Sequence, residues 1–412
     1  MSDARPTCRA CRAPLALVFA DLGSSPLANS YLGAEALAAA EPFYPLTVYV
    51  CERCWLGQLP AVARPEEIFS DYAYFSSYSA SWVEHARRYV EQMCERFAIG
   101  AGHQVVEIAS NDGYLLRHFL ARGVPVLGVE PAANVAAAAR ELGIPTEVRF
   151  FGREAAHDLV ERGLAADLVV GNNVFAHVPD LDDFVAGLAH LLKPAGVLTL
   201  EFPHLARLVA QNQFDTIYHE HFSYFSLLAA ERVLADRGIE LFDVEELPTH
   251  GGSLRLYGQR AGAGRPASER LAALRRRERE LGVETHAYYE AFAERVRETK
   301  RKLLAFLIDA KRAGKSIVGY GAAAKGNTLL NYCGVRNDFL DYVVDASPHK
   351  QGRYLPGSRL PIHAPDRILA TRPDYVLILP WNIRDEITRQ MSAVHEWGGR
   401  FVVAIPETTV LE

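Results

Sequence analysis

The segment Val106-Glu107-Ile108-Ala109-Ser110-Asn111-Asp112-Gly113 runs from an apolar stretch into a polar turn that ends in glycine. More apolar stretches follow along the chain, and helical segments separate them. The expected strands cover residues 104–109, 125–130, 167–172, 196–202 and 254–259. The expected helices cover residues 114–121, 135–142, 182–192 and 229–237. This alternation predicts an α/β fold, with a parallel sheet covered by helices on both faces.

The turn after the first strand lies where doubly wound sheets bind their cofactors. It holds one glycine, Gly113, beside polar Ser110, Asn111 and Asp112, which disfavours a dinucleotide because a pyrophosphate needs bare backbone. Glu130 ends the second strand and is placed to accept hydrogen bonds from two ribose hydroxyls. Acidic groups at both strand ends suit a cationic or neutral adenosine ligand, so we expect S-adenosylmethionine. The alternative is a capped turn that binds nothing.

Two CxxC pairs stand near the start of the chain, and they comprise Cys8, Cys11, Cys51 and Cys54. Two such pairs complete a tetrahedral shell of four thiolates, which is the closed geometry of structural zinc. The alternatives are two disulfides or buried cysteines with chance spacing. Residues 1–18 lack the apolar core of a secretory signal, so we expect a reducing, cytoplasmic location.

The composition limits the classes of partner. The 412 residues include 50 acidic and 44 basic side chains, giving a net charge of −6. This balance argues against a nucleic-acid partner, which normally needs a basic face. No stretch approaches the length of apolar sequence that spans a membrane, so we expect no membrane partner.

The rest of the chain contains two further kinds of segment. Residues 72–79 are polar and aromatic and predict an ordered loop, and a helix is expected over 81–97. Residues 268–312 are charged and contain no proline, which predicts one or two long amphipathic helices. A second alternating unit follows, with strands expected over residues 316–319, 339–344, 375–379 and 401–405. We therefore expect a zinc-binding module (1–70), a central cofactor-binding domain (71–265), a helical connector (266–312) and a C-terminal Rossmann-like domain (313–412).

The most distinctive stretch is Phe214-Asp215-Thr216-Ile217-Tyr218-His219-Glu220-His221-Phe222. It occurs in order with the paired cysteines, Asp21-Leu22-Gly23, Pro26-Leu27, Tyr72-Ala73-Tyr74, Glu107 through Gly113, Gly128-Val129-Glu130-Pro131, Asn172-Asn173, His177, His250-Gly251-Gly252 and Gly319 through Lys325. On these motifs the chain resembles, over essentially its full length, the three-domain sugar C-methyltransferases that act on nucleotide-linked ketosugars in deoxysugar biosynthesis. In that family the central domain is a class I methyltransferase domain.

The resemblance implies a set of site residues. Zinc would be held by the four cysteines named above. S-adenosylmethionine would contact Glu107, Ser110, Asn111, Asp112, Gly113 and Glu130, with Asn172 and Asn173 near its methionine end. Catalytic roles would fall on Tyr74, His177, Tyr218, Glu220 and His221. One departure is Ala109, which stands where some members carry glycine.

Methylation of a carbon next to a ketone requires removal of a C–H proton, so the site needs a base and donors for the enolate oxygen. We expect His221 to be the base, because an imidazole titrates near neutrality. Glu220 would orient the base or shuttle its proton. Tyr218, His219 or His177 would donate to the enolate. The alternative is that this stretch closes a loop with buried, hydrogen-bonded imidazoles.

Several of these positions allow a second interpretation. His177 would either donate to the substrate or serve as a structural histidine beside the crevice. Tyr74 lies in an aromatic loop, and such a loop is more often a lid or a packing element than a source of catalytic residues. The sequence His250-Gly251-Gly252 would let backbone approach the substrate closely, or would simply form a hairpin turn.

The C-terminal domain carries a possible binding site for the nucleotide. Gly321 and Lys325 lie in a strand–turn–helix segment that predicts a diphosphate cradle. Asp345 ends the next strand at the ribose-reading position. The remaining expected contacts with the nucleotide sugar are Lys350, Trp381 and Asn382. The alternative is a duplicated fold that serves dimerisation or active-site closure.

The sequence thus predicts an S-adenosylmethionine-dependent transferase that methylates a carbon of a nucleotide-linked ketosugar. Methylation at oxygen or nitrogen is one alternative, and a noncatalytic nucleotide-sugar-binding scaffold is another. The sequence does not indicate the nucleotide, the sugar, the carbon or the oligomeric state.

Overall fold

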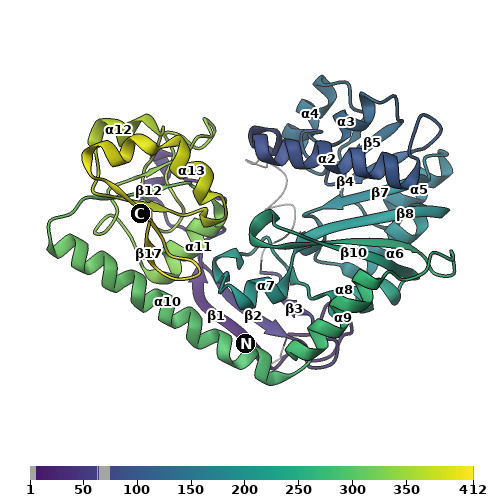
Figure 1. Ribbon diagram of the computed structural model, residues 1–412, viewed down its shortest axis with the longest axis horizontal. Coiled ribbons are helices and arrows are strands. Elements are labelled where there is room, and N and C mark those ends of the chain that lie inside the picture. Colours follow the sequence, from purple (N-terminus) through teal and green to yellow (C-terminus); the bar gives the residue numbers. More distant parts are fainter. Residues whose placement is uncertain (1–5, 63, 65–74, 412) are drawn as a thin grey trace.

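The computed structural model describes residues 6–62, 64 and 75–411, and these form three sheets (Figure 1). Two α/β units lie side by side, with the central domain on the right of Figure 1 and the C-terminal domain on the left. The α/β fold class is confirmed. Within the described part of the chain, no helix combines the length and apolar character needed to cross a membrane. Residues 72–74 of the expected aromatic loop, including Tyr74, lie outside the described residues.

The central sheet has seven strands. Their spatial order is β10 (Ile239–Leu247), β11 (Ser253–Arg260), β8 (Leu192–Pro203), β7 (Ala166–Asn172), β4 (Val105–Ile108), β5 (Val126–Val129) and β6 (Thr146–Glu147). The five strands from β8 to β6 run parallel, as expected for β8, β7, β4 and β5, whereas β6 was not predicted. The expectation of a wholly parallel sheet is wrong at its other edge, where β11 is antiparallel to β8 and to β10. Only a few residues join β10 to β11, and so short a connection forms a hairpin, which is antiparallel.

Side chains alternate between the two faces of this sheet. Val105, Leu168 and Val170 belong to the core that includes α2 and α3, whereas Val106 and Val169 belong to the core that includes α6 and α8. Figure 1 shows these helix pairs on opposite sides of the sheet. The helices of this region are α2 (Ala80–Phe97), α3 (Leu116–Leu120), α4 (Ala133–Glu141), α5 (Arg153–Glu161), α6 (Leu181–Leu191), α7 (Leu205–Ala210) and α8 (Leu227–Ala235). Coverage of both faces, as the sequence predicted, follows from the period of two in each strand.

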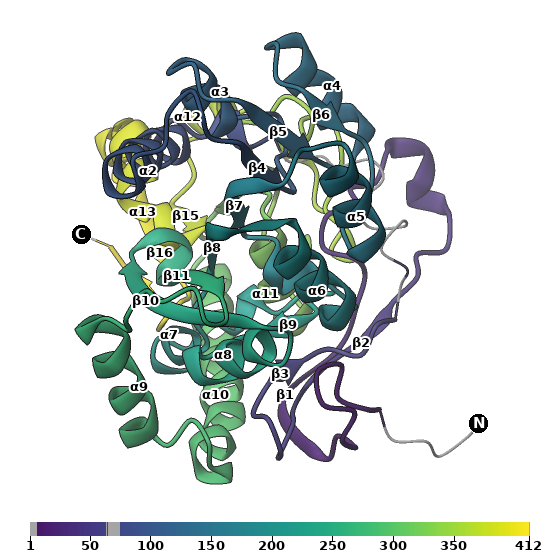
Figure 2. The same ribbon diagram turned by 90° about the vertical axis from the view of Figure 1, so that its right-hand side faces the viewer.

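The N-terminal module forms a small antiparallel sheet. Its strands are β1 (Leu17–Ser25), β2 (Tyr44–Val50), β3 (Gly57–Gln58) and β9 (Ser223–Tyr224). The last of these comes from the central region and pairs with β3, so the module shares its sheet with that region. Figure 2 shows β9 next to β3. This strand was not predicted, because two residues carry no periodicity.

Two helices connect the central and C-terminal regions. These are α9 (Glu269–Leu281) and α10 (His286–Arg312), which confirms the helices expected over 268–312. The helix α10 runs along the lower edge of the molecule from the N-terminal module to the C-terminal domain (Figure 1). Phe19 of β1 stacks on Phe292 of α10, with ring centroids 4.5 Å apart. The connector therefore packs on the N-terminal module as well as joining two domains.

The C-terminal sheet has six strands. Their order is β14 (Ile362–His363), β13 (Val343–Val344), β12 (Ile317–Tyr320), β15 (Tyr375–Ile378), β16 (Arg400–Val403) and β17 (Thr409–Val410). The first five are parallel and have the sequential order 3-2-1-4-5 of a Rossmann-like fold, as expected. The helices are α11 (Ala324–Cys333), α12 (Asp366–Thr371) and α13 (Arg384–Gln390). The 3-10 helices of the chain are η1 (Ala34–Ala38), η2 (Ser76–Tyr78), η3 (Phe175–His177), η4 (Phe214–Thr216), η5 (Thr249–Gly251), η6 (Trp381–Ile383) and η7 (Ser392–Trp397).

Candidate active site and zinc centre

The four N-terminal cysteines converge on one point. The Sγ atoms of Cys8, Cys11, Cys51 and Cys54 all lie within 4.8 Å of one another, and three of these residues are buried. The pairs Cys8–Cys54 and Cys11–Cys51 have Sγ atoms 3.5 Å apart, too far for a disulfide. Zinc–sulfur bonds of about 2.3 Å in a tetrahedron place the sulfurs roughly 3.8 Å apart, so the cluster fits zinc.

Both CxxC pairs adopt the same backbone turn. Arg12 and Trp55 follow the second cysteine of each pair and have φ angles of 62° and 60°. Each residue donates its N–H to the carbonyl of the first cysteine of its pair, at 2.9 and 2.8 Å. Gln58 Nε2 also donates to Cys8 Sγ at 3.2 Å. Donors aimed at sulfur suit thiolates and not neutral thiols, which supports metal binding.

This cluster lies one short strand away from the distinctive stretch 214–222. Gly57 of β3 pairs with Tyr224 of β9, and Leu59 N–H donates to the carbonyl of Phe222 at 3.0 Å. A Cβ atom on Gly57 would lie 3.2 Å from Tyr224 Cβ and from its carbonyl oxygen. The zinc module therefore holds the chain immediately after His221.

The polar turn after β4 is built from unusual backbone conformations. Ala109, Asn111 and Gly113 have φ angles of 57°, 50° and 76°. A Cβ atom on Gly113 would lie 2.3 Å from Ile144 Cδ1, so glycine is required there. Glu130 Oε2 accepts a hydrogen bond from Asn111 N–H at 2.9 Å, which fixes the carboxylate at the turn.

This turn carries buried polar atoms that have no hydrogen-bond partner among the described residues. They are both carboxylate oxygens of Glu107, Ser110 Oγ, Asp112 Oδ1 and both amide atoms of Asn172. Buried polar groups are normally paired, so orphaned ones point to a ligand. Burial, followed by the charges of Asp112 and Glu130, raises the pKa of Glu107 well above its usual range. A cationic ligand rich in hydrogen-bond donors would relieve both features, and S-adenosylmethionine is such a ligand.

A cluster of imidazoles adjoins the turn. The rings of His177 and His221 have centroids 4.8 Å apart, and Tyr218 lies 4.0 Å from His221. His250 Nε2 lies 3.2 Å from Asn173 Nδ2, at the end of β7. The structure therefore brings Tyr218, His177 and His221 together with His250, which lies beside Asn173 at the expected methionine end of the cofactor.

Burial keeps these imidazoles neutral. It is the largest cause that lowers the pKa of His177 and of His250 to about 4, and it lowers the pKa of His221 well below 6.5. His221 Nδ1 lies 2.8 Å from the carbonyl oxygen of Thr216 and must donate to it. Nε2 of His221 then carries the lone pair, as a base requires.

Glu220 has a separate set of contacts. Burial raises the pKa of its carboxyl to about 7, and a hydrogen bond from Asn29 opposes this shift. Asn29 Nδ2 donates to Glu220 Oε1 at 2.7 Å. The expectation that Glu220 orients His221 needs correction, because the carbonyl of Thr216 accepts from Nδ1 and thereby orients the ring.

The C-terminal domain contributes a lysine and a tryptophan. Lys325 Nζ lies 2.7 Å from Asn382 Oδ1 and 4.8 Å from the ring centroid of Trp381. Trp381 Nε1 donates to Asp215 Oδ2 at 2.7 Å across the domain boundary. A Cβ atom on Gly251 would lie 2.4 Å from Trp381 Cη2, so this glycine admits the indole ring. The charge of Lys325 also lowers the pKa of His221, which brings this domain to the imidazole cluster.

Other expected substrate contacts have local partners. Asp345 accepts hydrogen bonds from the N–H groups of Ala322 and Ser347, both at 2.8 Å. Lys350 Nζ donates to the carbonyl of Ala322 at 2.8 Å. These contacts use groups that the prediction assigned to a nucleotide, so the assignment of Asp345 and Lys350 stays a prediction with a competing structural role.

Two further expected contacts lie against other parts of the protein. A Cβ atom on Gly321 would lie 2.4 Å from Pro380 Cδ, so packing already requires glycine there. His219 Nε2 lies 3.1 Å from the carbonyl oxygen of Pro45, and its ring packs edge-on against Tyr44. His219 therefore faces the zinc module, and its role in substrate binding also stays a prediction.

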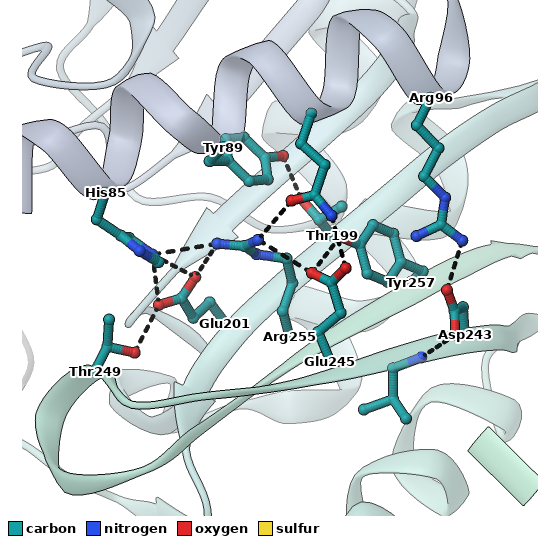
Figure 3. A network of polar contacts seen from close by, with 12 residues as sticks. His85, Tyr89, Arg96, Thr199, Glu201, Asp243, Glu245, Thr249, Arg255 and Tyr257 are labelled. Atoms are coloured by element: carbon teal, nitrogen blue, oxygen red, sulfur yellow. Dashed lines mark hydrogen bonds and ion pairs between the residues drawn. The ribbon is translucent and has the colours of Figure 1, made fainter. Parts of the chain in front are cut away.

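A buried ionic network beside the cluster was not predicted (Figure 3). Glu201 Oε1 lies 3.0 Å from His85 Nε2 and accepts a hydrogen bond from Thr249 Oγ1, and Oε2 lies 2.7 Å from Arg255 Nη2. Although burial would raise its pKa, the His85 hydrogen bond and the Arg255 charge hold the pKa of Glu201 at about 2. Thr249 precedes His250, so this carboxylate anchors the turn that carries one of the imidazoles. No local motif joins these residues, since they come from α2, β8, β11 and a turn.

Family comparisons agree with this arrangement. Three family models match in order, described as "Putative zinc binding domain" (residues 8–69), "Methyltransferase domain" (82–244) and "C-methyltransferase C-terminal domain" (248–406). The chain is 39% identical over 407 residues to the C-methyltransferase NovU of Streptomyces niveus, covering 98% of this chain and 96% of that protein. The match to the putative zinc binding domain confirms the zinc prediction for the cysteine cluster.

More distant similarities cover only part of the chain. The ubiquinone biosynthesis O-methyltransferase of Sinorhizobium medicae is 28% identical over 153 residues, which are 34% of this chain and 62% of that enzyme. The crystal structure of magnesium protoporphyrin IX methyltransferase from Synechocystis PCC 6803 is 15% identical, with a TM-score of 0.33, and covers 43% of this chain and 79% of that one. That structural likeness is too slight to support an inference about this chain.

Proposed function

Since the chain belongs to the zinc-binding, S-adenosylmethionine-dependent C-methyltransferases, we propose that it methylates a carbon next to the ketone of a nucleotide-linked ketosugar. The observation that carries this proposal is the buried imidazole cluster, in which His221 Nε2 is set up as a base beside the expected cofactor turn. Oxygen and nitrogen acceptors need no removal of a C–H proton, because their lone pairs are already present. Family membership likewise decides against a noncatalytic scaffold.

Deprotonation of the substrate is the step that these residues serve. His221 Nε2 takes the proton from the carbon next to the ketone, while the Thr216 carbonyl holds the ring in place. The imidazolium that results lies beside the negative enolate, and their attraction in a buried site offsets the cost of charging the ring. A neutral resting imidazole is therefore suited to this step, although burial weakens it as a base.

The enolate oxygen needs hydrogen-bond donors. Tyr218 lies against His221 and is placed to donate to the enolate oxygen, whereas the single N–H of the neutral His177 ring is already donated to the Glu220 backbone. Glu220 then takes part in moving the proton away from His221, since its pKa of about 7 allows it to accept one near neutrality. When bound, S-adenosylmethionine supplies the electrophilic methyl group.

The nucleotide end of the substrate is proposed to lie between the central and C-terminal domains. Lys325 and Asn382 would contact the diphosphate, and Trp381 would pack against the substrate beside His250 and Gly251. This placement would hold the ketosugar against the imidazole cluster, which is the positioning that a carbon nucleophile requires. A cytoplasmic location agrees with free thiols that bind zinc and is part of the same proposal.

The test uses candidate nucleotide 4-ketosugars in D₂O, with and without S-adenosylmethionine, followed by mass spectrometry and proton NMR. A new carbon-bound methyl that depends on the cofactor is expected, with loss of the neighbouring C–H proton. His221→Asn should lower turnover by about 10²–10⁴-fold with cofactor binding retained. His157→Asn, which changes an exposed imidazole on α5, is the matched control. Near-normal turnover of His221→Asn, or methylation at oxygen, would contradict the proposal.

A further inference from the structure

Asn29 lies in the zinc module, on the segment between β1 and η1, and this segment is tied to the C-terminal domain on both sides. Asn327 Nδ2 donates to the carbonyl of Ala28 at 2.6 Å. Leu32 and Tyr354 exchange two backbone hydrogen bonds of 3.0 and 2.9 Å. The position of Asn29 is therefore fixed by contacts that do not involve its own side chain.

The side chain of Asn29 reaches a carboxylate that lies 191 residues further along the chain. Its Nδ2 donates to Glu220 Oε1 at 2.7 Å, and Glu220 is only 3% exposed. An ionised carboxylate can only accept hydrogen bonds, so the NH₂ group of the amide must face it. A buried carboxylate without a donor would be strongly disfavoured in its ionised form.

We propose that Asn29 is a positioning residue for the reaction, because its amide donates to the buried Glu220 carboxylate and holds it in place. The inference rests on the proposed function, in which Glu220 accepts a proton during turnover. The zinc module thereby contributes a side chain to the proton path as well as the strand partner of β9.

The groups around Glu220 determine how its ionisation responds to pH. The charge of Glu220 raises the pKa of Tyr31 in the zinc module, and the Nζ atom of Lys350, from the C-terminal domain, lies over the Tyr31 ring. From the central domain, the ring of His177 donates to the Glu220 backbone, and His221 is its neighbour in sequence. Among these contacts, the Asn29 amide is the one that lowers the pKa of the Glu220 carboxyl against the effect of burial.

Removing the donor should therefore raise the pKa of Glu220 further. A hydrogen bond to a charged group is worth enough to move a pKa by about one to two units. In Asn29→Ala, the acid limb of kcat should shift to higher pH by that amount, with a roughly 5- to 50-fold loss at pH 7 and recovery of about half or more of the activity at pH 9. Asn29→Asp has the same shape and should shift the limb at least as far, because a second carboxylate disfavours ionisation of the first.

Arg359→Ala is the matched control, since it removes hydrogen bonds from the C-terminal domain to the carbonyls of Leu37 and Ala39 in the zinc module without touching Asn29 or Glu220. Its acid limb should stay at the wild-type pH, whatever its rate. An activity-independent readout is the ¹³C carboxyl shift of Glu220, identified by the signal lost in Glu220→Gln and titrated in wild type and Asn29→Ala.

The two readouts separate this inference from the proposed function. Unshifted kcat profiles in both Asn29 variants, or an unshifted ¹³C titration, would overturn the inference while leaving the proposed function intact. Absence of both deuterium exchange and methyl transfer in the wild-type enzyme with every ketosugar would overturn the proposed function, and the inference with it.

Discussion

Glu278 on α9 is a buried carboxylate whose replacement tests how the helical connector holds the active-site loops. Its Oε1 accepts from Leu227 N–H at 2.7 Å and lies 2.6 Å from His204 Nε2, and its Oε2 accepts from Leu228 N–H at 3.0 Å. The carboxylate therefore caps the N-terminus of α8 from another helix. His204 N–H in turn donates to the carbonyl of Gly252, in the turn that carries His250.

The expected loss of stability follows from the hydrogen-bond partners that Glu278→Ala would leave without an acceptor. Two buried N–H groups would lose their acceptor, at about 1–3 kcal/mol each, although water that enters the cavity recovers part of this. Breaking a buried carboxylate–imidazole pair typically costs roughly 3–5 kcal/mol, and we expect a local loss of that size. Glu278→Gln keeps one acceptor and should lose about half as much.

Hydrogen exchange followed by mass spectrometry suits this test, because it reports local opening even when the three domains unfold separately. A loss of about 3 kcal/mol should speed exchange at Leu227 and Leu228 by more than about a hundredfold. Glu280→Ala, which changes an exposed residue of the same helix, should alter stability by less than about 0.5 kcal/mol.

A change of less than about threefold at Leu227 and Leu228 in Glu278→Ala would refute the reasoning, since it would mean that water replaces the carboxylate at almost no cost. Much faster exchange at these amides together with a normal rate of methyl transfer would support the role of Glu278 in local stability. It would, however, show that the link through His204 does not reach the active site.

Three further predictions address the site itself. Cys54→Ser should reduce methyl transfer by about a hundredfold because β9 is misplaced, while calorimetry still detects cofactor binding. An equal loss of methyl transfer and cofactor binding would contradict an effect that acts through β9. Gly251→Ala should raise KM for the sugar more than Gly262→Ala does. Both glycines have a positive φ, but only a Cβ atom on Gly251 would lie 2.4 Å from Trp381 Cη2. Equal KM values in the two variants would count against the Trp381 contact. Because Glu220 has a pKa of about 7 and acts in its ionised form, kcat should fall as pH drops below 7 and this limb should vanish in Glu220→Gln; a limb that persists belongs to another group.

The sequence predicted the parts of the fold that short apolar segments encode. The strands β4 and β5 are buried throughout, and β7 and β8 contain long buried runs. Their alternation with helices was sufficient to predict the parallel part of the sheet. Helix α5 was missed because its buried stripe consists of two alanines and Leu159, which give little hydrophobic contrast. The short strands β6, β9, β14 and β17 were missed because two residues show no period.

The site was predictable where chemistry and sequence spacing coincide. The cysteine pairs identified the zinc ligands because a CxxC turn is local. The polar side chains from Glu107 to Gly113 were also identifiable, because they are adjacent in the sequence. The contact of Asn29 with Glu220 and the Glu201 network were not predictable, since each joins segments that only the tertiary fold brings together. The Thr216 carbonyl that holds His221 was also missed, because a backbone group has no signature in the sequence.

The arrangement of contacts explains why a metal that carries no chemistry belongs to this enzyme. Tyr218 to His221 lie in a loop whose flanking residues contact other domains. Thr328 of the C-terminal domain donates to the carbonyl of Ile217, and β3 of the zinc module pairs with β9. Contacts with Thr216 and His177 hold the loop within the central domain, and its geometry also depends on modules at both ends of the chain. The module that supplies β3 and Asn29 is small, and modules of this size commonly need a metal to fold. Zinc therefore stabilises the segment against which the loop from Tyr218 to His221 is positioned.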